Sequence, residues 1–155
     1  MALTKIADGG MPSGSIIQVV GNKITESSSS GDTRPSGNGA YTDTGLTQAI
    51  TPSSSSSKIL ILCNGLVYMR RNEEIRFRFL RGSTAIFTMP GYAETSDGFF
   101  TMPIPSGVLD SPSTTSSTTY KLQFYAQSDY TALRFNYGGS DGLGEASITL
   151  LEVVG

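Results

Sequence analysis

Hydrophobic and polar residues alternate along much of this chain with the two-residue period of a β-strand. The segment 74–81 reads EIRFRFLR, and its apolar positions Ile75, Phe77 and Phe79 alternate with two arginines and a leucine. Successive side chains of a strand point to opposite faces, so this pattern predicts a strand with one face in a core. The other face is expected to lie in water or at an interface.

The segment 45–62, GLTQAITPSSSSSKILIL, places a proline and five consecutive serines between two apolar runs. Both runs are rich in strand-forming residues, whereas a run of serines holds no helix and buries no apolar surface. The segment therefore predicts a strand, an exposed polar turn and a second strand.

The same arrangement recurs along the chain, and no segment has a 3.6-residue period of useful length. The last predicted strand is apolar on both faces, with Ile148, Leu150 and Glu152 on one and Leu151 and Val153 on the other, so we expect it to be central. Short strands between Ser, Thr, Gly, Asn and Pro clusters predict an all-β fold, a single jelly-roll-like two-sheet antiparallel β-sandwich. The predicted strands are 15–20, 41–44, 46–50, 58–64, 67–69, 75–80, 84–89, 98–104, 120–127, 132–137 and 146–154.

The chain divides into a short N-terminal arm, 1–14, and a β-sandwich knob domain, 15–155. Within 1–13 the only sizeable apolar side chains are Leu3, Ile6 and Met11, which are too few for a core. We expect these three residues to anchor the arm on a partner or on a neighbouring copy. A low-complexity stretch at 26–39, ESSSSGDTRPSGNG, predicts a long surface loop.

Composition limits the possible partners. Charged residues make up 15% of the chain and the formal net charge is −2, so no broad cationic surface is available for nucleic acid. The longest apolar runs fall far short of the roughly 20 residues of a membrane-spanning helix. The N-terminus lacks the features of a secretory signal, which predicts a protein made in the cytoplasm without a signal peptide. One cysteine, Cys63, excludes an intrachain disulfide, and its apolar neighbours predict an inert thiol.

The absence of histidine argues against catalysis, because it removes the commonest general base and the usual zinc ligand. A carboxylate pair for glycoside cleavage is the remaining alternative, but solvated turn carboxylates are the favoured interpretation and no β-helical repeat is present. We therefore expect no enzyme activity and no cofactor. The carboxylates considered are Glu73, Glu74, Glu94, Asp97, Asp110 and Asp129.

Two further features of the sequence are possible binding sites. In 137–145, YGGSDGLGE, Asp141 and Glu145 could hold Ca²⁺, but such a site needs six to eight oxygens, so a Gly-rich turn is favoured and no metal is expected. Tyrosines offer sugar-stacking platforms, although they more often cover sheet edges. Tyr92 and Tyr130 are the best candidates because they lie among turn residues.

The sequence MRRN at 69–72, followed by Arg76, Arg78 and Arg81, is the one basic cluster. Two interpretations stay open. The arginines either form a solvated sheet face or pair with carboxylates of a neighbouring protomer, for which the planar guanidinium is well suited.

Four segments, YTDTGLTQAITPSSSSSKILIL, LRGSTAIF, LDSPSTTSSTTYKLQFYAQS and ASITLLEVVG, resemble a group of tailed-bacteriophage structural proteins of the marine phage type. The resemblance covers nearly all of 15–155. It implies a virion or tail-fibre component whose shape is similar to the trimeric knobs of viral fibres and of TNF and C1q domains. Because only the short arm precedes this module, we expect a head-decoration or knob protein.

The expected function is that of a non-enzymatic phage structural protein, a homotrimer held on the virion exterior by its arm and bound to other capsid or tail proteins. The alternative is a tail-fibre tip protein that adsorbs to host surface glycan, and a glycan hydrolase is the least favoured hypothesis. Any receptor contact is expected at exposed loop residues, namely Tyr92, Asp97, Asp129 and Tyr130.

Overall fold

A computed structural model describes residues 11–25, 39–70, 73–93, 99–127, 133–136 and 144–155. All regular elements in these ranges are β-strands, and they pair in antiparallel fashion. None of the described residues belongs to a helix that could cross a membrane. The strands are β1 (Ile16–Thr25), β2 (Tyr41–Ile50), β3 (Lys58–Asn64), β4 (Leu66–Arg70), β5 (Glu73–Arg81), β6 (Thr84–Ala93), β7 (Phe99–Pro103), β8 (Val108–Asp110), β9 (Thr118–Ala126), β10 (Leu133–Phe135) and β11 (Glu145–Val153).

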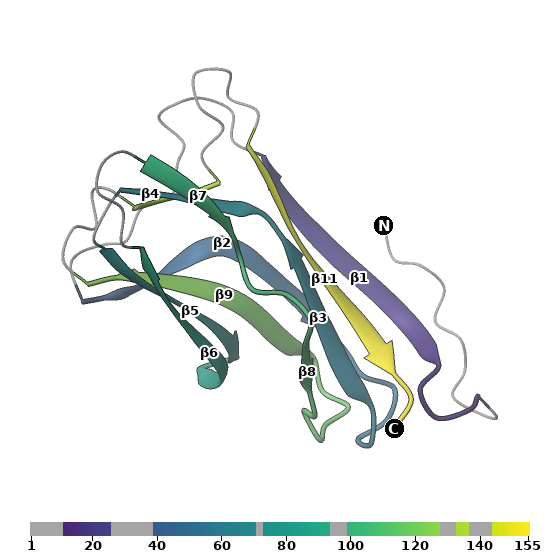
Figure 1. The fold of residues 1–155 in the computed structure, drawn as a ribbon. Coiled ribbons are helices and arrows are strands. Elements are labelled where there is room, and N and C mark those ends of the chain that lie inside the picture. The colour runs from purple at the N-terminus through teal and green to yellow at the C-terminus, as the bar shows by residue number, and fades with distance from the viewer. Residues whose placement is uncertain (1–10, 26–38, 71–72, 94–98, 128–132, 137–143) are drawn as a thin grey trace.

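The strands form two facing layers (Figure 1). One layer has the order β1-β11-β3-β8 and the other has the order β2-β9-β5-β6, while a short sheet of order β10-β4-β7 continues the first layer. The chain crosses repeatedly between the layers, and this strand order is that of a double Greek key. The predicted jelly-roll-like β-sandwich is thus confirmed, and so is the central place of the last strand, β11.

The core fills the space between the layers with alternate residues of each strand. Ile148 and Leu150 on β11 face Phe77 on β5 and Phe124 on β9 across this space, and all four are fully buried. The Phe124 and Phe135 rings lie 6.0 Å apart, a separation typical of packed aromatic pairs. Each large apolar side chain that is fully buried contributes roughly 1.5 to 3 kcal/mol, so these positions dominate the stability of the fold.

Gly65 joins β3 to β4 where the first layer bends. A Cβ atom at this position would lie 2.9 Å from the Cβ of Ala146 and 3.3 Å from the Cδ1 of Ile104. Atoms of a real side chain do not approach so closely, so only glycine lets the strand pass over β11 and continue into the short sheet.

The serine turn between β2 and β3 differs from the prediction that its serines bury nothing. Ser57 is buried, and its hydroxyl donates to Oε1 of Glu152 at 2.8 Å. The backbone N–H and the hydroxyl of Ser53 donate to the same oxygen, each at 2.6 Å. With its amide nitrogen turned toward them, Gln18 donates to Oε2 of Glu152 at 3.0 Å and to the Thr51 carbonyl at 3.1 Å. The turn therefore supplies hydrogen bonds to a fully buried carboxylate, which a buried charge requires.

Two strand predictions also needed correction. Residues 41–50 form one strand, β2, instead of two, because Gly45 adopts a φ of +87° in an irregularity that keeps β2 paired with β9. The short strand β8 was not predicted, since only three residues, VLD, carry it between turn residues. Its Asp110 carboxylate accepts hydrogen bonds from Arg81 Nη1 at 2.9 Å and from the Tyr120 hydroxyl at 2.7 Å. These hydrogen bonds link the two layers.

Candidate functional site

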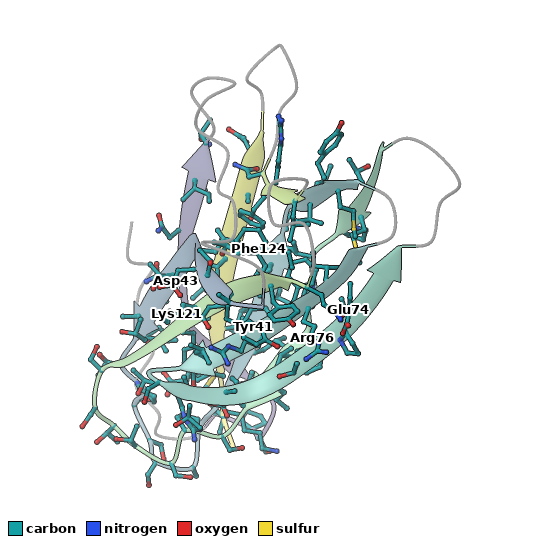
Figure 2. The ribbon with its side chains drawn as sticks, turned by 90° about the vertical axis from the view of Figure 1, so that its left-hand side faces the viewer. Tyr41, Asp43, Glu74, Arg76, Lys121 and Phe124 are labelled. Atoms are coloured by element: carbon teal, nitrogen blue, oxygen red, sulfur yellow. The ribbon has the colours of Figure 1, made fainter. Side chains whose placement is uncertain are left out.

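The outer surface of the β2-β9-β5-β6 sheet gathers aromatic and charged residues from three neighbouring strands. Strand pairing sets Tyr41 beside Tyr125 and Asp43 beside Gln123, while Arg76 and Arg78 lie opposite Tyr125 and Gln123 from the other side. Figure 2 looks toward this sheet, with Phe124 on its inner side. We call this surface the Tyr–Arg face and define it by Tyr41, Asp43, Glu74, Arg76, Arg78, Lys121, Gln123 and Tyr125.

Two tyrosines and two arginines stack on the Tyr–Arg face. The ring centroids of Tyr41 and Tyr125 are 5.2 Å apart. The guanidinium of Arg78 reaches across β9 to lie 3.7 Å from the Tyr41 ring centroid, and that of Arg76 lies 5.0 Å from the Tyr125 ring centroid. Guanidinium groups are attracted to the electron-rich faces of aromatic rings, so both arginines are held flat against the sheet.

Hydrogen bonds fix the polar side chains between the stacked pairs. Arg78 Nε donates to Oε1 of Gln123 at 2.7 Å, and the Gln123 amide donates to Oδ1 of Asp43 at 2.6 Å. Lys121 Nζ donates to Oδ2 of Asp43 at 2.9 Å, and Arg76 Nε donates to Oε1 of Glu74 at 2.6 Å. The network joins β2, β9 and β5, so the positions of these groups are set before any ligand arrives.

The Asp43 carboxylate is held in its charged form. Partial burial alone would raise the pKa of Asp43, but hydrogen bonds from Lys121 and Gln123 oppose this effect. The positive charges of Lys121 and Arg78 act in the same direction, and together these interactions hold the pKa below its usual value.

A surface pocket of about 360 Å³ adjoins the Tyr–Arg face at its Asp43–Lys121 end. Its size lies at the lower end of the range for small-molecule sites. Gly82 has open space where a side chain would be, which leaves the pocket accessible on that side. The lining residues are Asp43, Gly45, Leu46, Thr47, Gly82, Thr119 and Lys121.

The outer surface of the β1-β11-β3-β8 sheet is largely apolar, unlike the Tyr–Arg face. Register places Val19, Leu151, Leu60 and Leu109 in one row across all four strands, one residue from each. Leu109 is 54% exposed, Ile16 48% and Leu62 38%, which are large values for aliphatic side chains. We call this surface the apolar face and define it by Ile16, Val19, Leu60, Leu62, Leu109, Leu151 and Val153.

The structure separates the arginines that the sequence grouped together. Arg76 and Arg78 lie on the Tyr–Arg face, whereas Arg81 pairs with the inward-facing Tyr120 position and binds Asp110 and the Ser111 carbonyl. Each of the three has a partner within the chain. A contact with a neighbouring protomer is not needed to satisfy them, and such a contact stays a prediction.

Several other predicted residues lie outside the described part of the chain. These are Leu3, Ile6, Asp97, Asp129, Tyr130 and, in the glycine-rich segment, Asp141. Of the anchoring residues only Met11 is described, and it is 36% exposed. Tyr92 occupies the register position opposite Glu74 on β6, at the margin of the Tyr–Arg face, and its side chain is not described.

The remaining candidate groups have ordinary structural partners. Glu145 pairs with Lys23 at 3.1 Å, and within the described ranges no three Cys, Asp or Glu side chains gather as metal ligands would. Burial raises the pKa of the Cys63 thiol to about 12, so very little thiolate exists at neutral pH.

Reasoning from sequence missed the Tyr–Arg face as a unit. Its residues come from three strands and meet only because β9 pairs with β2 on one side and β5 on the other. The detectable signal was local: polar or aromatic residues recur at every second position in 41–43 and again in 121–125. Neither segment indicates by its own sequence that it pairs with the other.

Comparisons with known proteins gave no family assignment. No protein-family model matches the chain, and no curated protein is significantly similar to it in sequence. Among solved structures, chains of infectious bursal disease virus are similar in shape: the Gt strain has a TM-score of 0.43 at 11% identity and the Gx strain 0.43 at 15%.

Both matches cover 88% of this chain, which spans only 38% and 37% of those viral chains. The dimeric latent PorU of Porphyromonas gingivalis gives a TM-score of 0.40 at 10% identity, covering 97% of this chain and 14% of that one. Likenesses at this level to such different proteins assign neither identity nor function to the chain.

Proposed function

We propose that this chain is a non-enzymatic virion structural protein of a tailed phage, a homotrimer displayed on the particle exterior and attached through its N-terminal arm. The resemblance of its strand and turn segments to phage structural proteins supports the virion role. The jelly roll is compatible with this role, but the same fold also serves lectins and enzymes, so the proposal needs support from a surface of the molecule.

The observation that carries the proposal is the apolar face. Seven aliphatic residues lie on this sheet surface, four of them in one row across the four paired strands, while Ile16, Val153 and Leu62 lie in the rows on either side, which also hold Lys58 and Thr149. Exposed apolar surface of this continuity marks a contact site, and interfaces between identical subunits are the most apolar class. Lys58 and Lys23 lie only toward the ends of this surface, so it offers little charge to a partner of different chemistry. We therefore assign it to contacts between copies of this chain.

The arm starts at one end of the apolar face. Gly14 N–H donates to the Val154 carbonyl and Val154 N–H donates to the Ser15 carbonyl, both at 2.9 Å. These bonds fix the beginning of the sandwich beside the end of β11, next to Ile16 and Val153. In a trimer each apolar face would be shared between two neighbours, and the three arms, which begin at one end of this face, would lie on the same side of the assembly, where they could engage one site on the particle.

Light scattering coupled to size exclusion tests this proposal. Wild type at micromolar concentration should have three times the mass of one chain, and Leu109→Arg should shift the protein to monomer because it buries a charge in the interface. Leu66→Arg is the matched control, since Leu66 is 50% exposed but lies on β4, beyond the Gly65 bend. A monomeric wild type, or equal dissociation of both variants, would contradict the proposed trimer.

Exterior display is tested with intact virions and antibody against the purified protein. Labelling spread over the head supports a decoration protein, and labelling confined to the tail supports the alternative below. Labelling only after particle disruption would overturn exterior display.

The second candidate is a tail-tip adsorption protein that binds host surface glycan. The observation that favours it is the Tyr–Arg face with its adjoining pocket, because fixed tyrosines and polar groups around a small open cavity are typical of ligand sites. The two candidates use different sheet surfaces, so one trimer could carry both roles.

A further inference from the structure

We propose that the Tyr–Arg face binds a sugar that carries an anionic group, with the anion on Arg76 and Arg78 and the sugar ring in the pocket beside Asp43 and Lys121. This inference goes beyond the virion role and does not depend on it. It rests only on side chains of the described residues.

Both arginines have hydrogen-bond donors that no described residue accepts. Arg76 and Arg78 each use Nε within the chain, toward Glu74 and Gln123. Their Nη1 and Nη2 groups form no hydrogen bond within the described part of the chain. An arginine whose Nη groups are open can bind two oxygens of a carboxylate or phosphate side by side.

The two arginines are preorganised for binding. Arg76 is fixed by the Tyr125 ring and Glu74, and Arg78 is fixed by the Tyr41 ring and Gln123. Long side chains normally lose rotamer freedom when they bind a ligand, which weakens affinity. Here much of that loss has already occurred in the free protein.

The Tyr–Arg face carries a local positive charge. The chain has a formal net charge of −2, yet the Tyr–Arg face holds three cations, Arg76, Arg78 and Lys121, against two carboxylates, Glu74 and Asp43. Arg76 is paired with Glu74 and Lys121 with Asp43, so the difference of one positive charge lies at Arg78, whose hydrogen-bond partner among the described residues is the neutral Gln123 amide. An anion is therefore attracted to this surface on a chain that otherwise repels it.

The pocket beside the arginines suits a sugar. The pocket is lined by hydrogen-bond acceptors and donors. They are the Asp43 carboxylate, the Lys121 ammonium and the hydroxyls of Thr47 and Thr119. Sugar hydroxyls both donate and accept, so this mixed lining suits them better than it suits a uniformly acidic peptide. Asp43, Gln123 and Arg78 lie in one row across three neighbouring strands, so Asp43 beside the pocket lies two strand spacings, about 10 Å, from Arg78.

Calorimetric titration of the purified protein with four probes tests the proposal. The probes are oligogalacturonate, which carries carboxylates, phosphomannan, which carries phosphates, neutral dextran, and polyglutamate as an acidic peptide. We expect binding to one or both anionic saccharides and none to dextran or polyglutamate. Equal binding of polyglutamate would make this an acidic-protein docking surface and overturn the saccharide assignment, as would the absence of binding to both anionic saccharides.

Three variants locate the site for whichever saccharide binds. Arg78→Lys keeps the charge but loses the planar donor pair, and we expect about tenfold weaker binding. Thr47→Trp fills the pocket from an exposed position of β2 and should weaken binding at least as much. Lys58→Gln, which removes one positive charge on the opposite sheet, should bind like wild type. Unchanged binding by Arg78→Lys and Thr47→Trp would overturn the site, and light scattering on the same samples shows separately whether the trimer proposal holds.

Discussion

The two outer surfaces of this sandwich have similar backbones and opposite chemistry. On the Tyr–Arg face each charged side chain has a partner in the chain, although the Nη groups of Arg76 and Arg78 have no acceptor among the described residues. On the apolar face the outward side chains are aliphatic, and they can form neither hydrogen bonds nor ion pairs. One sheet surface therefore has most of its polar groups paired within the chain, whereas the other exposes apolar area that only a contact with another molecule could remove from water.

Covering the two surfaces with another protein would have opposite energetic consequences. Exposed ion pairs and cation–π contacts contribute roughly 1 kcal/mol or less each, and burying the Tyr–Arg face under a second protein would require its charges to be desolvated. Burying the apolar face releases water from leucine, isoleucine and valine side chains, roughly 25 cal/mol for each Å² covered. A symmetric contact through the apolar face is therefore the cheaper way to assemble.

The largest expected effect on stability comes from a substitution in the core, which supports both sheets. Phe124 is fully buried between the sheets, so Phe124→Ala should lower the free energy of unfolding by about 3 to 5 kcal/mol through lost burial and a cavity. Lys121→Ala, which changes an outward position of the same strand, should cost no more than about 1 kcal/mol. Urea unfolding followed by tyrosine fluorescence, at one fixed protein concentration, measures both. Similar losses in the free energy of unfolding for the two variants would contradict the placement of Phe124 in the core and Lys121 on the outer surface of β9.

A smaller effect is expected at the serine turn, which supports the layer that carries the apolar face. Ser57→Ala removes a hydrogen bond to the buried Glu152 carboxylate and should cost about 1.5 to 3 kcal/mol. Ser55 is exposed, and Ser55→Ala should stay within about 0.5 kcal/mol of wild type. Urea unfolding at neutral pH compares them. If both variants match wild type, the hydrogen bonds to Glu152 contribute little to the stability of that layer.

The smallest effect concerns pH and the Tyr–Arg face. The pKa of Asp43 is lowered in the folded state, so the carboxylate contributes stability above its unfolded pKa of about 3.8, and this contribution is lost as pH falls through the folded pKa. Asp43 is 53% exposed, which limits the contribution to about 1 kcal/mol or less. A carboxyl NMR titration should give a midpoint below 3.8, and Lys121→Met should raise it. A midpoint at or above 3.8 in wild type would contradict the network described for this face.

Much of the fold was predictable because strand alternation and turn residues are local signals. Lys58–Asn64 forms a strand with the predicted bounds, and β11 is central as its two apolar faces indicated. The strand β8 was not predictable, because three residues carry no periodicity and Val108–Asp110 is a strand only by pairing with β3. The buried Ser57 was missed for a related reason: its partner, Glu152, lies 95 residues away.

The candidate site was less predictable than the fold. Arg76 and Arg78 were identified from their alternation, but Arg81 seemed to belong with them because sequence spacing does not reveal that it pairs at an inward position. Tyr41 and Tyr125 are 84 residues apart and share a face only through the pairing of β2 with β9. The row of aliphatic residues on the apolar face likewise requires the order β1-β11-β3-β8, which the sequence does not state.

The most direct test of the distinction between the two surfaces is hydroxyl-radical footprinting of the wild-type protein and of the Leu109→Arg variant at the same concentration. Leu62 and Ile16 should be protected in wild type and reactive in the variant, because the apolar face is covered only in the oligomer. Tyr41 and Tyr125 should react equally in both, because the Tyr–Arg face remains open. Equal reactivity of Leu62 and Ile16 in the two proteins, or protection of the tyrosines in wild type alone, would contradict the assignment of the apolar face to the contact between copies.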